Sequence, residues 1–108
     1  MKKKDLHKMD VPFQGHYYML EDAGTYHCRN CKQQLFHSKH KFQSGSGWPS
    51  FDQPIDASVT IDEQVGRGRP VQCSACQQFL GLLVKGEGFT VSDQRFDINS
   101  SALMFKPA

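Results

Sequence analysis

The stretch GTYHCRNCKQQLF, residues 24–36, decides the fold because it carries the first of two Cys-x-x-Cys pairs. The second pair lies in VQCSACQQFLG, residues 71–81, and the two pairs hold all four cysteines of the chain. A two-residue spacing lets both sulfurs of a pair reach one centre. We therefore expect a structural Zn²⁺ site with four thiolate ligands: Cys28, Cys31, Cys73 and Cys76.

Other interpretations of the cysteines stay open. Iron in the same tetrahedron is the leading metal alternative, whereas two disulfides are disfavoured in a cytosolic chain that is kept reduced. A single redox-active pair would leave the second pair unexplained. His27 lies beside Cys28, and with four cysteines available we expect it to be a neighbour of the site and not a ligand. If one metal takes all four thiolates, no thiol is left for catalysis.

Length and composition predict one globular domain. With 108 residues, a second independent core would leave each half too small to fold comfortably, and 38% hydrophobic with 22% charged residues is ordinary for a soluble protein. Residues 1–10 are polar and are expected to form a flexible N-terminal segment, so the predicted domain covers residues 11–108.

Charge and hydropathy exclude several functional classes. The net charge of +2 is small, and its Lys-rich N-terminus lacks the interleaved aromatics of a nucleic-acid-binding patch. No stretch approaches the roughly 18 apolar residues of a membrane span. The basic start MKKK is followed by no apolar run, so we expect no secretion signal and a cytoplasmic location.

Short apolar runs between turn signals indicate a mainly β architecture. Strand-like segments are expected around Val59 and Ile61, over residues 79–84, and in FTVSD (89–93), RFDINS (95–100) and ALMFK (102–106). GRGRP, residues 66–70, is expected to form a loop. Gly45, Gly47 and Pro49 exclude a regular helix around Trp48 and predict a compact loop there.

Four motifs in order make the sequence similar to a known family, the B-type peptide methionine sulfoxide reductases or SelR domain. They are the two cysteine motifs quoted above, with KFQSGSGWPSF (41–51) between them and RFDINSSALMF (95–105) after them. The resemblance runs from about Val11 to Pro107. It implies two antiparallel β-sheets and a four-cysteine zinc site away from the active centre. It also implies a cysteine that reduces methionine R-sulfoxide and is then regenerated through thioredoxin.

At the chemical centre the sequence departs from this pattern. Asp97 occupies the position of the family's nucleophilic cysteine, and Ser46 that of the resolving cysteine. Phe79 and Leu82 stand where many members have the histidines that bind the sulfoxide oxygen and donate a proton. A carboxylate has no two-electron redox cycle like that of a thiol. A hydrolytic step using Asp97 as a nucleophile remains open.

Part of the family's pocket is retained, in Trp48, Arg95 and Asn99. Because Arg95 and Asp97 are two residues apart on a predicted strand, their side chains should share a face and could form an ion pair. We expect a pseudoenzyme whose pocket, with Trp48, Arg95, Asp97 and Asn99 as ligand-binding residues, accepts a methionine sulfoxide-like or methylated cationic group. The alternatives are an active peptide-methionine (R)-S-oxide reductase and a zinc-stabilised protein-interaction module.

Overall fold

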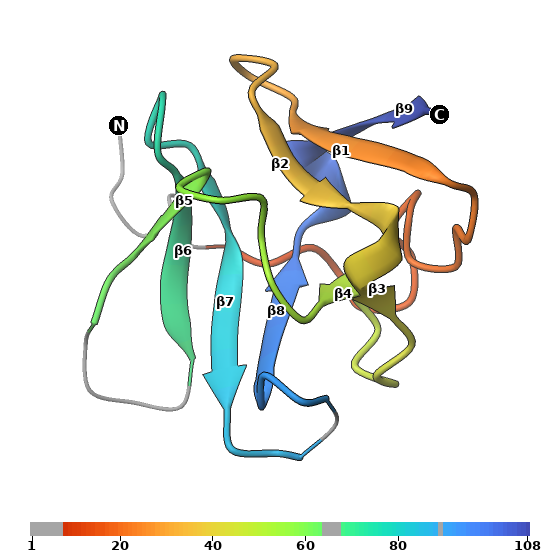
Figure 1. The fold of residues 1–108 in the computed structure, drawn as a ribbon, viewed down its shortest axis with the longest axis vertical. Helices are drawn as coiled ribbons and strands as arrows, with labels where there is room; N and C mark the ends of the chain where they lie inside the picture. The colour runs from red at the N-terminus through yellow and green to blue at the C-terminus, as the bar shows by residue number, and fades with distance from the viewer. Residues whose placement is uncertain (1–7, 64–67, 89) are drawn as a thin grey trace.

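A computed structural model describes residues 8–63, 68–88 and 90–108 (Figure 1). The strands form two antiparallel sheets, as the resemblance implied. The smaller sheet has the order β2-β1-β9 and the larger one the order β3-β4-β8-β7-β6-β5. The strands are β1 Gly24–Cys28, β2 Gln34–His37, β3 Lys41–Phe42, β4 Ser50–Phe51, β5 Val59–Ile61, β6 Arg69–Cys73, β7 Phe79–Lys85, β8 Gln94–Ile98 and β9 Leu103–Pro107.

Helical structure in the described ranges is confined to short 3-10 turns, among them η2 (Ser38–His40) and η3 (Ser100–Ala102). The predicted mainly β class is therefore confirmed. Over the same ranges, no helix is long and apolar enough to cross a membrane.

Aromatic side chains from both sheets form the centre of the core. Tyr26 of β1 and Phe36 of β2 meet Phe51 of β4 and Phe96 of β8, and all four are fully or almost fully buried. Phe36 stacks on Phe51 with ring centroids 4.3 Å apart, and Tyr26 meets Phe51 edge-on at 5.1 Å. Such ring pairs add to the free energy gained from burial and fix how the two sheets face each other.

Strands β7 and β8 approach each other closely at the centre of the larger sheet. Gly81 of β7 pairs with Ile98, and a Cβ on Gly81 would lie 2.0 Å from the backbone oxygen of Asp97. Only glycine fits at this point of the sheet, which places the backbone of Asp97 directly against β7.

The structure corrects two local predictions. Residues 90–93 form a turn between β7 and β8, in which Asp93 has a positive φ and accepts a hydrogen bond from the backbone of Gly88 at 2.8 Å; Phe89 lies outside the described residues. Gly86 and Gly88, which precede residues 90–93 and have positive φ, favour a loop over the predicted strand. Of the predicted loop 66–70, Arg69 and Pro70 already belong to β6, paired with Leu83 and Leu82, whereas 66–67 are not described.

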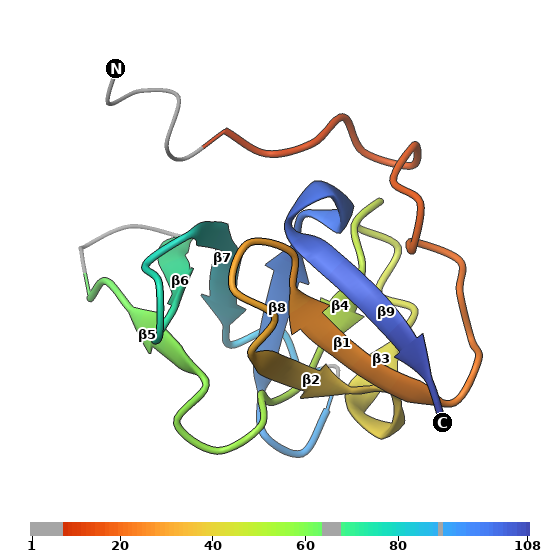
Figure 2. The ribbon, with the colours of Figure 1, turned by 90° about the horizontal axis from the view of Figure 1, so that it is seen from above.

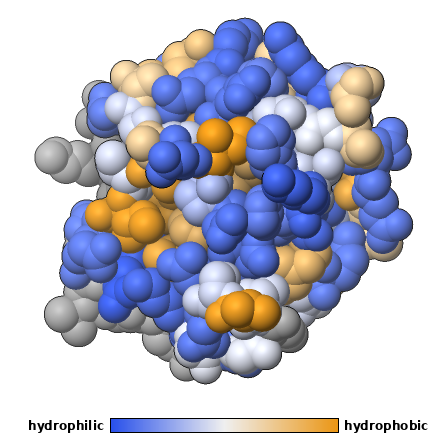
Figure 3. Space-filling view, in the orientation of Figure 1, coloured by the Kyte–Doolittle hydropathy of each residue, from blue (hydrophilic) through white to orange (hydrophobic). Residues whose placement is uncertain are grey.

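From residue 8 on, the N-terminal part of the described chain runs over the end of the molecule that carries η3 and the start of β9 (Figure 2). Residues 8–10, assigned from composition to the flexible segment, are hydrogen-bonded to the body of the domain, while residues 1–7 lie outside the described part. In the orientation of Figure 1, the surface is mostly hydrophilic, with hydrophobic residues in separate small patches (Figure 3).

Candidate functional site

The four cysteines converge as predicted. Their Sγ atoms all lie within 4.8 Å of one another, and the pairs Cys28–Cys76 and Cys31–Cys73 are 3.7 and 3.6 Å apart. A tetrahedral ion with Zn–S bonds of about 2.3 Å holds its sulfurs about 3.8 Å apart. These two pairs match this separation, so the four sulfurs are gathered closely enough to hold one metal ion.

The two cysteine turns have the same backbone construction. Lys32 donates its backbone N–H to the carbonyl of Cys28, and Gln77 donates to that of Cys73, at 2.8 and 2.9 Å. Lys32 and Gln77 each follow the second cysteine of their pair and have φ values of 73° and 65°. This left-handed residue turns the chain back so that both sulfurs of a pair face the same point.

The cysteine cluster joins the two sheets. Cys28 ends β1 of the smaller sheet and Cys73 ends β6 of the larger one. Burial raises the pKa of the Cys73 thiol to about 12 and also raises that of Cys28, so thiolates at these positions require a cation beside them. His27 directs Nδ1 to the backbone oxygen of Lys32 at 2.9 Å, in keeping with its expected place outside the ligand set.

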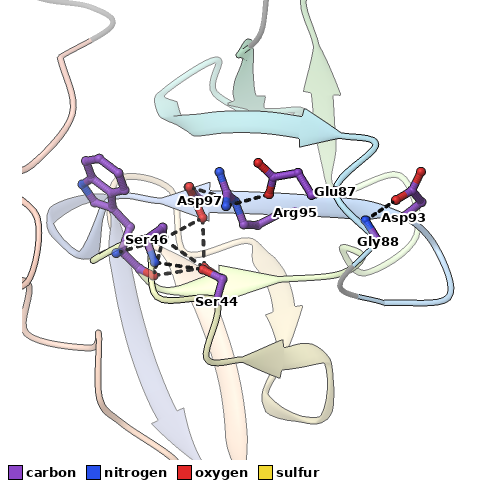
Figure 4. A network of polar contacts seen from close by, with 9 residues as sticks. Ser44, Ser46, Glu87, Gly88, Asp93, Arg95 and Asp97 are labelled. Atoms are coloured by element: carbon purple, nitrogen blue, oxygen red, sulfur yellow. Dashed lines mark hydrogen bonds and ion pairs between the residues drawn. The ribbon is translucent and has the colours of Figure 1, made fainter.

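Asp97 lies at the centre of the larger sheet, 4% exposed, in a network of polar contacts (Figure 4). Its Oδ1 accepts hydrogen bonds from Ser50 Oγ at 2.9 Å and from Ser46 Oγ at 3.1 Å. Its Oδ2 lies 3.2 Å from Nε of Arg95. A second nitrogen of the same guanidinium group, Nη1, lies 2.7 Å from Oε1 of Glu87. The ion pair suggested by the two-residue spacing of Arg95 and Asp97 is present.

Opposing effects act on the carboxyl group of Asp97. Burial raises its pKa above the ordinary value of 3.8, and the nearby Glu87 carboxylate adds to the rise. The hydrogen bond from Ser50, the charge of Arg95 and the hydrogen bond from Ser46 lower it, but less than burial raises it. The network thus partly offsets the cost of burying this carboxyl group.

Strand β7 carries apolar residues at the two positions where the resemblance predicts histidines. Leu82 is the direct cross-strand partner of Asp97, so their side chains lie side by side on one face of the sheet. Phe79, 7% exposed, begins β7. Neither residue can supply a proton to a ligand bound beside Asp97.

Trp48 and Asn99, the other two predicted ligand-binding residues, hold the N-terminal segment. Trp48 Nε1 donates to the backbone oxygen of Asp10 at 2.8 Å. Asn99 donates from Nδ2 to the backbone oxygen of Lys8 at 2.9 Å and accepts at Oδ1 from the backbone N–H of Asp10 at 2.7 Å. The side chains of the predicted residues therefore form two groups, Arg95 with Asp97 and Trp48 with Asn99, and the backbone of Trp48 is bonded to the two serines that also bind Asp97.

Sequence reasoning missed several members of the site. Ser50, whose hydroxyl is 2.7 Å from that of Ser44, is the cross-strand neighbour of Asp97 on β4. Glu87 lies in the turn after β7 and reaches Arg95. The signal for Ser50 was its place in the motif around Trp48, whereas nothing in the sequence pointed to Glu87.

A model of the SelR domain family matches residues 4–107. The chain belongs to the SelR domain family. Relatives with a similar sequence include the peptide methionine sulfoxide reductases B9 and B3 of Arabidopsis thaliana, 44% identical over 93 residues and 38% identical over 101 residues. Another is the peptide methionine sulfoxide reductase MsrB of Thioalkalivibrio sulfidiphilus strain HL-EbGR7, 44% identical over 103 residues.

These matches cover 84%, 92% and 92% of this SelR-family chain for B9, B3 and MsrB in turn. They cover 65%, 57% and 74% of the relatives' own lengths. Membership is consistent with the two-sheet fold and with the four-cysteine cluster found here.

Proposed function

We propose that this SelR-family chain binds methionine-containing peptide segments, oxidised or not, in the pocket around Trp48 and Asn99, and does not reduce them by thiol chemistry. The cysteine cluster would hold Zn²⁺ with Cys28, Cys31, Cys73 and Cys76 as ligands, in a purely structural role. The ion's complete coordination would stabilise the junction of the two sheets.

The observation that carries this proposal is the state of Asp97. It stands at the position of the family's nucleophile as a buried carboxyl group whose oxygens face Ser46, Ser50 and Arg95. A carboxylate cannot take up the sulfoxide oxygen and be regenerated by a thiol reductant, as a cysteine can through its sulfenic acid. The four sulfurs of the chain's cysteines are gathered in the metal cluster, so none serves the pocket.

The contacts of Asp97 favour a neutral ligand over a methylated cation. A cation would need an uncompensated negative charge beside an aromatic ring. Arg95 already offsets the charge of Asp97, and two serine hydroxyls occupy one of its oxygens. Trp48 and Asn99 instead offer hydrogen-bonding groups of the kind that bind a peptide backbone.

Peptide-methionine (R)-S-oxide reductase activity is the second candidate. The names of the similar proteins favour it, since all three are called peptide methionine sulfoxide reductases. For this chain it would require a route in which no pocket thiol takes part.

Turnover and binding measured on the same preparation separate the two candidates. Zinc content is determined first, and reduction of a peptide containing methionine R-sulfoxide is then followed with dithiothreitol as reductant. The positive control is the triple variant Asp97→Cys, Phe79→His and Leu82→His, which restores the family's residues. Binding of the same peptide is measured by calorimetry.

The proposal expects binding without turnover in the wild type and turnover in the triple variant. Wild-type turnover that persists through repeated purification and disappears in Asp97→Ala would establish the reductase instead. Failure of the wild type to bind either the methionine or the sulfoxide peptide would refute the binding function.

A further inference from the structure

Both amide atoms of Asn99 are used on the backbone of one short segment. Its Nδ2 binds the carbonyl of Lys8 and its Oδ1 binds the N–H of Asp10, so the two bonded peptide groups flank Met9. In a β-ladder, a residue of one strand binds its neighbour strand in the same way, through one N–H donor and one C=O acceptor. Here the amide side chain of Asn99, which is 4% exposed, supplies both the donor and the acceptor. The two hydrogen bonds of Asn99 are made to backbone atoms only. They therefore place no requirement on the side chain of the residue between them.

Three further hydrogen bonds fix Asp10. Trp48 Nε1 donates to its backbone oxygen, and its carboxylate accepts from the backbone N–H and the hydroxyl of Ser101 at 3.0 and 2.6 Å. Further along, the N–H of Phe13 donates to the carbonyl of Gly47 at 2.7 Å. Residues 8–13, which we call the strap, are therefore bound beside Trp48 and Asn99, two of the predicted pocket residues.

The strap is held by these anchors more than by packing. Val11 and Phe13 are each 61% exposed, and Met9 is half-buried. A cavity of about 510 Å³ lies beside the anchors, lined by Asp10, Val11, His16, Tyr17, Arg29 and Ser101, among others. A segment with few apolar contacts opens at a lower free-energy cost than the core does.

We propose that the strap is an intramolecular ligand: Asn99 and Trp48 form a main-chain clamp that holds Lys8–Asp10 in cis and takes an extended methionine-containing peptide in trans when the strap is released. The occupant in cis has methionine between the two peptide groups that Asn99 binds. Binding in trans rests on the proposed function, whereas occupancy in cis does not.

Full-length protein with Asp10→Ala tests occupancy in cis, because this change removes both bonds to Ser101 and leaves the clamp intact. The readout is hydrogen exchange of the Trp48 indole N–H, an unambiguous signal because the chain has a single tryptophan. Exchange should be faster in Asp10→Ala than in the wild type. Asp10→Asn, which keeps an oxygen for Ser101, should restore slow exchange, and Asp56→Ala, on an exposed residue, should change nothing.

Binding in trans is measured with the synthetic peptide Leu-His-Lys-Met-Asp-Val-Pro, the sequence of residues 6–12, and with a matched peptide in which alanine replaces methionine. Release of the strap should tighten apparent binding of the methionine peptide about tenfold, because the competent fraction rises. Unchanged indole exchange in Asp10→Ala would overturn occupancy in cis. Faster exchange without tighter peptide binding would overturn the clamp in trans, whereas the peptide-binding function would fall only if the wild type bound neither the methionine nor the sulfoxide peptide.

Discussion

The cysteine cluster and the Asp97 network are both built from residues far apart in sequence, but they differ in what they retain of the family's chemistry. In the cluster, all four sulfurs lie at distances that fit one tetrahedral ion. In the network, a carboxyl group with serine and arginine partners stands where the resemblance predicts the nucleophile. Under the proposed function, the difference teaches that a fold can keep its structural site while the side chains of its reactive site are exchanged for others that satisfy one another.

Loss of a cluster sulfur should have the largest effect. Cys73→Ser removes a buried ligand that joins β6 to the smaller sheet, and we expect the free energy of unfolding to fall by about 4 kcal/mol or more. Thermal unfolding and zinc content report it. Ala75→Ser, in the same turn but exposed, should keep both the metal and the stability. A stable, metal-free Cys73→Ser protein would contradict a structural role for the cluster.

A smaller but still large loss of stability is expected where Gly81 of β7 packs against the backbone of Asp97 in β8. The added Cβ in Gly81→Ala would press on the backbone oxygen of Asp97, so stability should fall by about 3 kcal/mol. Gly68→Ala is the matched control, because the atoms nearest its Cβ would be side-chain atoms of Leu82 and not backbone atoms, with Cδ1 nearest at 3.1 Å. Denaturant unfolding measures both. Equal stabilities of the two variants would show that β7 and β8 are not packed as described.

The smallest effect is expected from removing the charge of Asp97. Because its folded pKa lies above the ordinary 3.8, the native state holds the proton longer, and the contribution of Asp97 to stability falls as pH rises from 3.8 through the folded value. Asp97→Asn should lack this fall and lie within about 1 kcal/mol of the wild type at pH 7. Urea unfolding across this pH range, with Asp56→Asn as control, measures it. A stability difference between the wild type and Asp97→Asn that instead grows in favour of the wild type through this window would contradict the raised pKa.

Much of this arrangement could be predicted because it is encoded locally or by motif. The two cysteine pairs predicted the cluster, and short apolar runs between turn signals predicted β5, β7, β8 and β9. The turn after β7 was predicted as a strand because its branched and aromatic residues outweighed the neighbouring glycines. The hydrogen bonds between Asn99 and the strap join residues about 90 positions apart. No local sequence pattern predicts a contact over that separation.

The most direct test of the central claim, that the pocket has no group able to accept the sulfoxide oxygen, is a single-turnover experiment without added reductant. Zinc-loaded protein is incubated with methionine R-sulfoxide, and methionine formed and oxygen gained by the protein are measured together by mass spectrometry. A thiol would become a sulfenic acid and release one equivalent of methionine. We predict no methionine and no mass change for the wild type, and both in the triple variant. One equivalent of methionine from the wild type, matched by one oxygen on the protein, would contradict the account.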